Sequence, residues 1–347
     1  MSFRPMPCLA LALFAAACQQ APSGGTASGT PAAPPAVKTP TNIPANVSHG
    51  EAPVGTGTAP APVEAVAPAR SSQRLHHIRF EISHGTIDIA KDVKYEAWTF
   101  SGRVPGPVIR VTQGDTVDFT LVNKAPMPHS MDFHAAEIAP DKYYVNVMTN
   151  DSVHYRFVAR VPGVFMYHCG TAPVAAHIAN GMYGALIVDP VTPRPAAREF
   201  VLVQSEFYLT PDSTGKPRSL AWDRLLSLAP DFVVFNGRSS QYAEHPLTVK
   251  PNELVRLYLL NAGPNRQSSF HVVGGIFDRA FLDASVSGGL AGVQTVAVPV
   301  GGGAIFELRL KQPGEYPFVT HAFADATKGA VGVLRAGDGT APSAMNH

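Results

Sequence analysis

The central part of the chain repeats one pattern of strands and turns. Residues 114–123 (GDTVDFTLVN) match residues 252–261 (NELVRLYLLN), and both segments alternate apolar and polar side chains. This alternation is typical of a half-buried β-strand. Residues 157–168 match residues 306–321 in the same way, each with a strand, a Pro-Gly turn, a second strand and a final histidine. The repeat therefore predicts two β-rich domains of similar construction.

Short strands between Gly and Pro turns are typical of β-sandwiches and Greek-key barrels. Residues 184–188 (GALIV) and 329–333 (GAVGV) form a further matching pair. We therefore expect an all-β fold of two tandem Greek-key β-sandwich or barrel domains, over residues 73–190 and 195–338. Residues 219–228 are the only segment that predicts a helix of note.

The first residues resemble a bacterial secretion signal. Residues 9–17 are apolar but too few to cross a bilayer. Three alanines precede Cys18, as in a lipobox, which predicts a lipoprotein signal peptide over residues 1–17 and acylation of Cys18. An ordinary signal peptide cleaved nearby is the alternative, since Ala15 stands where a lipobox usually has Leu. Gln19 favours the outer membrane, so we expect an outer-membrane or periplasmic protein of the cell envelope.

The segment that follows is poor in large apolar side chains. Residues 18–72 are rich in Pro, Ala and Gly, and such a composition cannot bury enough surface to offset the entropy of ordering. We expect a disordered tether with a reach on the order of 40 Å, and a disordered tail over residues 339–347. The formal charge is +1 and there is no basic cluster, so the sequence excludes a typical nucleic-acid-binding protein.

One cysteine has the neighbours of a copper ligand. Cys169 is followed by His177 and Met182, and His129 lies upstream in the same predicted domain. Two imidazoles, a thiolate and a distant thioether are the ligands of a type 1 (blue) copper site, which transfers electrons. The second repeat has Ala322 where the first has the cysteine, so only the first domain can hold type 1 copper. The other two cysteines lie in the first twenty residues, so no disulfide is expected in the mature body.

A second metal site follows from the alternation of side chains along a strand. His168 and Cys169 are neighbours and therefore point to opposite faces. If residues upstream are also extended, His134 and Asp132 share a face on which they can meet His168. The repeat supplies His321 at the equivalent edge of the second domain. Three imidazoles with an open position make a catalytic metal site.

At these residues the chain resembles the copper-containing nitrite reductases, across most of residues 78–336. The motifs that carry the resemblance are WTFSGRVPGP (98–107), PHSMDFHAA (128–136), YHCGTAPVAAHIANGMYG (167–184), VVFNG (233–237), NAGPN (261–265) and SSFHVVG (268–274). The step from Cys169 to His177 resembles the short-loop, lipid-anchored class. The resemblance implies two cupredoxin domains, a homotrimer, and a type 2 copper between domain 1 of one subunit and domain 2 of the next.

The resemblance also implies roles for individual residues. By position, the type 1 ligands are His129, Cys169, His177 and Met182, and the type 2 ligands are His134, His168 and His321. Asp132 and His271 match the acid-base pair of the family, and Val273 matches an apolar residue that crowds the bound substrate.

The implied activity is the one-electron reduction of nitrite to nitric oxide in denitrification. The expected cofactor is about two coppers per chain. Electrons would reach type 1 copper from a small cupredoxin or c-type cytochrome and then pass through Cys169 and His168 to type 2 copper.

Two segments depart from the family pattern. Residues 135–144 (AAEIAPDKYY) replace a Gly-rich loop and are expected to alter access to the second metal or the choice of substrate. The segment after His321 is one residue shorter than in the family, which affects the surroundings of that ligand.

Two other functions remain as alternatives. A laccase-like multicopper oxidase needs several His-x-His pairs, and the chain has none; Gly170 also follows Cys169 in place of a histidine. A lipid-anchored electron carrier or copper-holding protein would need only the type 1 ligands. The presence of Asp132, His134, His271 and His321 together favours the enzyme.

Overall fold

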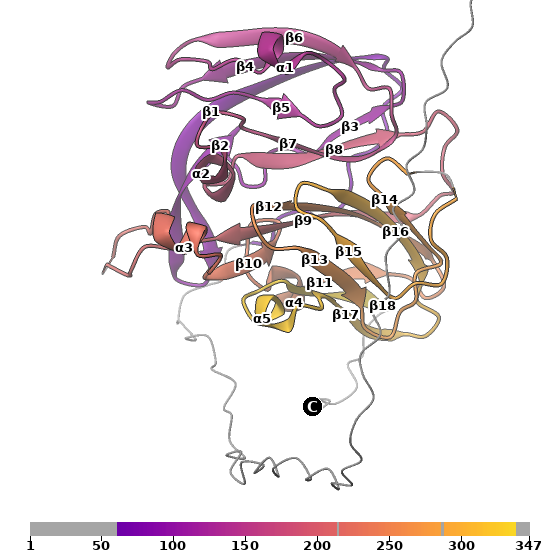
Figure 1. The fold of residues 1–347 in the computed structure, drawn as a ribbon. Coiled ribbons are helices and arrows are strands. Elements are labelled where there is room, and N and C mark those ends of the chain that lie inside the picture. The colour runs from indigo at the N-terminus through magenta and orange to yellow at the C-terminus, as the bar shows by residue number, and fades with distance from the viewer. Residues whose placement is uncertain (1–60, 214, 286–287, 338–347) are drawn as a thin grey trace, which may run out of the picture. The chain divides into compact units, whose positions relative to one another are not determined.

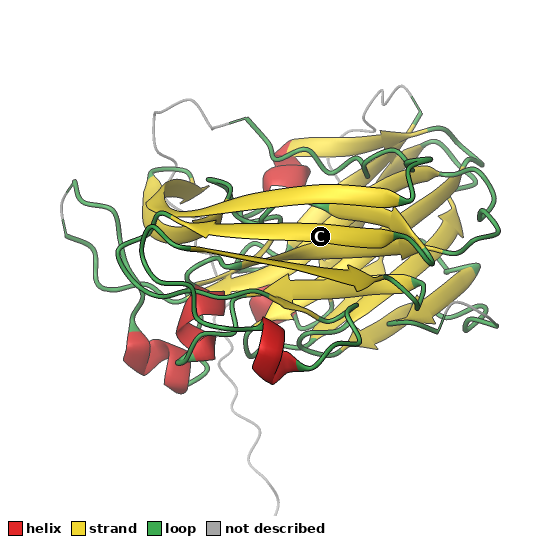
Figure 2. Cartoon of the chain, turned by 90° about the horizontal axis from the view of Figure 1, so that it is seen from above, coloured by secondary structure: helices red, strands yellow, loops and turns green. Residues whose placement is uncertain are grey.

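The computed structural model describes residues 61–213, 215–285 and 288–337. These residues form four β-sheets arranged as two β-sandwiches (Figure 1; Figure 2), which confirms the all-β prediction. The predicted signal peptide, Cys18, most of the tether and the tail over 339–347 lie outside the described residues. In the described part of the chain, no helix is long and apolar enough to cross a membrane.

The first sandwich contains the strands of the first repeat. One sheet has the order β2-β1-β4-β6 and the other β3-β8-β7-β5. The strands are β1 (Leu75–Ala90), β2 (Val93–Phe100), β3 (Ile109–Thr112), β4 (Thr116–Asn123), β5 (Asp132–Phe133), β6 (Ser152–Val158), β7 (Gly163–His168) and β8 (Tyr183–Asp189). Parallel pairing of β1 with β4 and of β3 with β8 makes the connections cross between the sheets, so neighbours in the chain are not always neighbours in a sheet.

The second sandwich follows the linker after β8. One sheet has the order β10-β9-β12-β16-β14 and the other β11-β18-β17-β13-β15. The strands are β9 (Arg198–Phe207), β10 (Phe232–Phe235), β11 (His245–Val249), β12 (Leu254–Gly263), β13 (Ser268–Val272), β14 (Arg279–Leu282), β15 (Thr295–Val298), β16 (Gly303–Arg309), β17 (Gly314–Thr320) and β18 (Val331–Ala336).

The predicted repeat is present as strands. Residues 114–123 contain β4 and residues 252–261 contain most of β12, and in each copy the Pro-Gly turn joins strands of two different sheets, β6 to β7 and β16 to β17. His271 lies on strand β13, where residues 268–271 pair with β15 and residues 270–272 pair with β17.

The helices are short and lie at the ends of the sheets. They are α1 (Pro140–Tyr143), α2 (Val174–Ala179), α3 (Trp222–Leu226), α4 (Gln241–Glu244) and α5 (Phe323–Ala326). The helix predicted within residues 219–228 is confirmed as α3. The prediction that it was the only helix of note was wrong, since α2 is longer and follows the cysteine motif. The Ala-rich sequence of α2, VAAHIA, entered the sequence analysis only as part of the spacing between two predicted metal ligands.

Strand β7 faces two different hydrophobic cores. Tyr167 and Cys169 lie in the core of the first sandwich, with the rings of Phe80, Phe119 and Phe133. Val164 and Met166 point the other way, into a core that is shared with side chains of the second sandwich such as Tyr258 and Ile305. The alternation along β7 therefore places each residue on either the inner or the domain-facing side of the strand.

The two sandwiches approach closely where they meet. A Cβ atom at Gly303 would clash with the backbone carbonyl of Val164, and one at Gly163 would lie 2.6 Å from the carbonyl oxygen of Asp283. Buried ion pairs lie at the same boundary: Arg110 contacts Asp189 at 2.8 Å and Glu199 at 2.7 Å. Such pairs fix the relative positions of the groups, because breaking one leaves a buried charge.

The packed body begins before residue 73, where the sequence analysis placed the start of the first domain. Val66 forms a bridge with Phe200 of β9, and Ala65 is buried against the second sandwich. Arg70 then donates hydrogen bonds to Thr112 and to the Pro190 carbonyl. This segment therefore contacts both sandwiches.

Candidate metal centres

Three metal-binding side chains converge inside the first sandwich. The Sγ atom of Cys169 lies 3.1 Å from Nδ1 of His177 and 3.8 Å from Nδ1 of His129. The two Nδ1 atoms are 3.1 Å apart. All three side chains are completely buried, as is that of Met182, which belongs to the same core cluster. The four predicted type 1 ligands are therefore brought together.

Local backbone structure positions these ligands. Cys169 comes directly after β7 and its N–H donates to the Met182 carbonyl at 3.1 Å. The Met182 N–H donates to the His177 carbonyl at 3.1 Å, so the turn after α2 returns the chain to the cysteine. The N–H of Ser130 points at Sγ of Cys169 at 3.3 Å. A backbone donor of this kind stabilises a thiolate.

Electrostatics keep the two histidines neutral. Burial, followed by the neighbouring His177 and His84, lowers the pKa of His129 to about 3. Burial, followed by His84, lowers the pKa of His177 to about 4. Both rings therefore offer a lone pair at neutral pH, as a metal ligand must. A soft sulfur with two imidazole nitrogens in a dry pocket fits copper.

A second group of donors lies on the domain-facing side of β7. Strand β5 pairs with β7 so that Asp132 is opposite His168. Nε2 of His168 lies 3.1 Å from Nε2 of His134 and 3.8 Å from Oδ2 of Asp132. The predicted meeting of these three residues is confirmed. One potential ligand atom from each of the three residues lies within 4.8 Å of the other two, as in a metal site.

The tautomer of His168 suits a ligand. Its Nδ1–H donates to the backbone carbonyl of Cys169 at 2.9 Å, so Nε2 carries the lone pair. The pKa of His134 is lowered, mainly by desolvation and then by His168, while Asp132 and a backbone hydrogen bond with Gly301 oppose the change. His134 is exposed on the single chain and His168 is buried, so the group is open on one side.

The remaining predicted site residues lie on the second sandwich. His321 follows β17 and His271 lies on β13, with ring centroids 5.4 Å apart. Among the described residues of one chain, His321 is in neither group of potential metal ligands. His271 donates from Nδ1 to the Gln294 carbonyl at 2.9 Å. Val273 follows on the same segment and is 44% exposed.

The altered loop after His134 packs on the first sandwich. Ala135 is buried and Ile138 contacts the same core. Tyr144 donates to the Phe133 carbonyl at 3.1 Å, and burial raises its pKa to about 12. The loop is therefore anchored at both ends beside the second group of ligands.

Comparisons with known proteins agree with this arrangement. A multicopper oxidase family model matches residues 81–193. The copper-containing nitrite reductase of Neisseria meningitidis serogroup A is 38% identical over 283 residues, which cover 78% of this chain and 72% of that protein. The solved copper nitrite reductase of Nitrosomonas europaea is 37% identical, with a TM-score of 0.71 over 76% of this chain and 94% of that one. A laccase from Botrytis aclada shares the fold at 16% identity and a TM-score of 0.64.

The chain belongs to the copper-containing nitrite reductase family. The two β-sandwiches are its cupredoxin-like domains. His129, Cys169, His177 and Met182 form the type 1 copper site of this nitrite reductase. The group of Asp132, His134 and His168 is consistent with the family's type 2 site.

Two residues beside the type 1 site of this nitrite reductase were not singled out from the sequence. Nε2 of His84 lies 3.1 Å from Nε2 of His129. The His84 ring stacks on Trp98 at 5.0 Å, and Trp98 packs edge-on against His177 at 4.8 Å. The structure brings them together through the register of the β1–β2 hairpin, which places His84 opposite Trp98.

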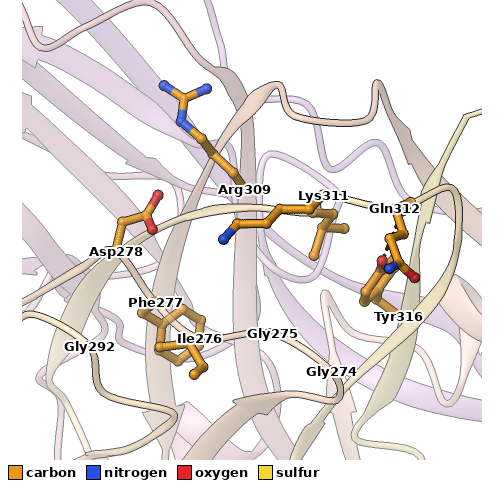
Figure 3. A pocket seen from close by; sticks show the side chains of 11 residues that line it. Gly274, Gly275, Ile276, Phe277, Asp278, Gly292, Arg309, Lys311, Gln312 and Tyr316 are labelled. Atoms are coloured by element: carbon orange, nitrogen blue, oxygen red, sulfur yellow. Dashed lines mark hydrogen bonds between the residues drawn. The ribbon is translucent and has the colours of Figure 1, made fainter.

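A cleft in the second domain is a separate feature of the described residues. It has a volume of about 820 Å³ and is lined by residues 274–278 and 309–312, with Gly292 and Tyr316 (Figure 3). Asp278, Arg309 and Lys311 contribute charges to it (Figure 3). None of the predicted metal ligands lines it, so the cleft is not the copper site.

Proposed function

We propose that this chain is a nitrite reductase that converts nitrite to nitric oxide and water, consuming one electron and two protons. The observation that carries the proposal is the pair of ligand groups on opposite sides of β7, joined by the peptide bond between His168 and Cys169. Copper at the two sites would supply one-electron storage and a Lewis acid for the nitrite oxygen atoms.

The proposed type 2 site has His134, His168 and His321 as ligands, with His321 coming from the adjacent subunit of a homotrimer. Two observations support a type 2 site that is shared between subunits. Within one chain His321 does not join the other two histidines. Both His134 and His321 are exposed on the single chain, so each is accessible to another copy.

The backbone gives a short route between the two ligand groups. Cys169 and His168 are consecutive, and consecutive Cα atoms are about 3.8 Å apart. The His168 ring also donates a hydrogen bond to the carbonyl of Cys169. The path from a copper bound by Cys169 to one bound by His168 would therefore run through the protein and not through solvent.

We propose that Asp132 and His271 deliver the two protons that the reaction consumes. Asp132 lies 3.8 Å from His168, on the open side of the ligand group. His271 lies beside His321, and because its Nδ1 is held by the Gln294 carbonyl, Nε2 is the atom that can exchange a proton. Positioned groups of these two types deliver protons in general acid catalysis. The exposed side chain of Val273 is proposed to crowd the bound nitrite.

We further propose that the enzyme works in the bacterial cell envelope, as a periplasmic or outer-membrane protein anchored by lipid at Cys18. Its donor would be a small cupredoxin or a c-type cytochrome, and its role denitrification. The apolar run over residues 9–17 and the alanines before Cys18 support an envelope location.

The test is metal analysis combined with a nitric oxide assay. The enzyme should hold about two coppers per chain and form nitric oxide from nitrite when given reduced donor. One copper per chain and no nitric oxide would identify an electron carrier instead.

A further inference from the structure

A histidine outside the ligand set contacts the type 1 site. His84 lies on β1 and is half-buried, with its ring stacked on Trp98 at an interplanar angle of 11°. Its Nε2 is 3.1 Å from Nε2 of His129, which is hydrogen-bond distance for two ring nitrogens. The two rings are nearly perpendicular, at 80°.

The chemistry of the ligand decides which ring donates. Nδ1 of His129 is the nitrogen that faces Cys169 and His177, so it is the one that offers its lone pair to copper. A neutral imidazole carries its proton on the other nitrogen. Nε2–H of His129 is therefore the donor, and Nε2 of His84 is the acceptor.

The other histidine ligand has no equivalent partner. Among the described residues, Nε2 of His177 is buried and has no hydrogen-bond partner; the Trp98 ring packs 4.8 Å from the His177 ring. Only one of the two imidazole ligands, His129, thus donates such a hydrogen bond. It acts on the basicity and orientation of His129 alone.

We propose that His84 is a positioning residue of the type 1 centre, which accepts a hydrogen bond from His129 and thereby sets the orientation and donor strength of that ligand. An acceptor on the far nitrogen makes an imidazole a better donor, and such outer partners change metal affinity by about 10–100-fold. A stronger donor favours Cu(II) over Cu(I), so the hydrogen bond lowers the reduction potential. The inference rests on the type 1 site and not on the nitrite chemistry.

Two substitutions separate the hydrogen bond from the stacking. His84→Phe keeps an aromatic ring against Trp98 but cannot accept a hydrogen bond. His84→Gln loses the ring but has a carbonyl that accepts from Nε2–H of His129. His77→Phe is the matched control, since His77 lies on the same strand, has a side chain that is 71% exposed and contacts Asp118.

The readouts are the midpoint potential of the type 1 copper, its visible absorption and its electron paramagnetic resonance spectrum. In His84→Phe the Cu(II)/Cu(I) affinity ratio should fall about tenfold, which raises the potential by about 59 mV. His84→Gln and His77→Phe should stay near wild type. A shift in His84→Gln without one in His84→Phe would assign the effect to stacking and overturn the proposal, as would equal shifts in the two variants or an unchanged His84→Phe. If His84→Phe fails to bind copper, His84→Gln decides. Blue colour retained in His84→Gln supports the hydrogen bond, and loss of the blue colour in His84→Gln overturns the proposal.

Discussion

The side chains of the consecutive residues His168 and Cys169 point to opposite sides at the end of strand β7. The thiol points into the core of the first domain, 3.1 Å from Nδ1 of His177. The imidazole points to the domain-facing side, 3.1 Å from Nε2 of His134. One strand therefore presents two separate ligand groups, which substitutions should affect independently.

Asp132 should matter for turnover and not for the blue copper. We expect Asp132→Asn to lower kcat by about 10²–10⁴-fold, because the amide cannot deliver a proton. The type 1 absorption should remain, since Asp132 is not in the ligand group of Cys169. Asp141→Asn on the exposed helix α1 is the control. Near wild-type turnover in Asp132→Asn, measured with a nitric oxide electrode, would remove this residue from the mechanism.

Met182 should affect only the type 1 centre. We expect Met182→Leu to change the colour and raise the type 1 potential on the order of 59 mV, which is a tenfold change in the electron-transfer equilibrium constant. The type 2 signal in electron paramagnetic resonance should be unchanged. Met148→Leu, at an exposed methionine, controls for general effects. Loss of both signals in Met182→Leu would show that the two centres are not separable.

The copper-free protein should lose stability in acid because of its buried histidines. His129 and His177 have pKa values of about 3 and about 4 in the folded chain, against 6.5 when unperturbed. Below pH 6.5 the unfolded chain binds more protons than the folded chain, so the free energy of unfolding falls as the pH falls. The contribution is complete above pH 6.5 and is lost progressively down to about pH 3.

The expected slope is up to about 1.4 kcal/mol per pH unit for each histidine. Urea unfolding of the copper-free protein between pH 7 and pH 4 measures it. His177→Gln should reduce the slope by the contribution of one histidine, whereas His77→Gln should leave the slope unchanged. A slope that is the same in all three proteins would mean that the buried His177 ring does not control acid stability.

The contact between the domains should not accept a methyl group at Gly303. A Cβ atom there meets the Val164 carbonyl at a distance that real side chains do not adopt. We expect Gly303→Ala to reduce the free energy of unfolding by about 1–3 kcal/mol. Gly85→Ala is the control, because a Cβ at Gly85 meets nothing within 4 Å. Equal stability of the two variants in denaturant unfolding would show that the boundary can relax.

The sequence predicted the features that depend on local periodicity. The alternation along β7 correctly separated His168 from Cys169, and the repeat correctly located β4 and β12. Both follow from the two-residue period of a strand, which can be read without knowing the neighbours.

Features that depend on pairing between distant segments could not be predicted from local periodicity. The contact of His84 with His129 requires the register of β1 against β2 and the position of the loop before β5. Residues 61–72 pack against both domains, although their composition assigned them to the tether. This packing depends on contacts such as that of Val66 with Phe200. Nothing in the local sequence specifies those partners.

Diffraction at the copper absorption edge from crystals of the copper-loaded protein tests the central claim most directly. The account predicts two copper peaks per chain, one bound by Cys169 with His129, His177 and Met182. The other should be bound by His134, His168 and the His321 of an adjacent subunit. A single peak at Cys169, with the His168 imidazole in contact with no metal, would contradict it.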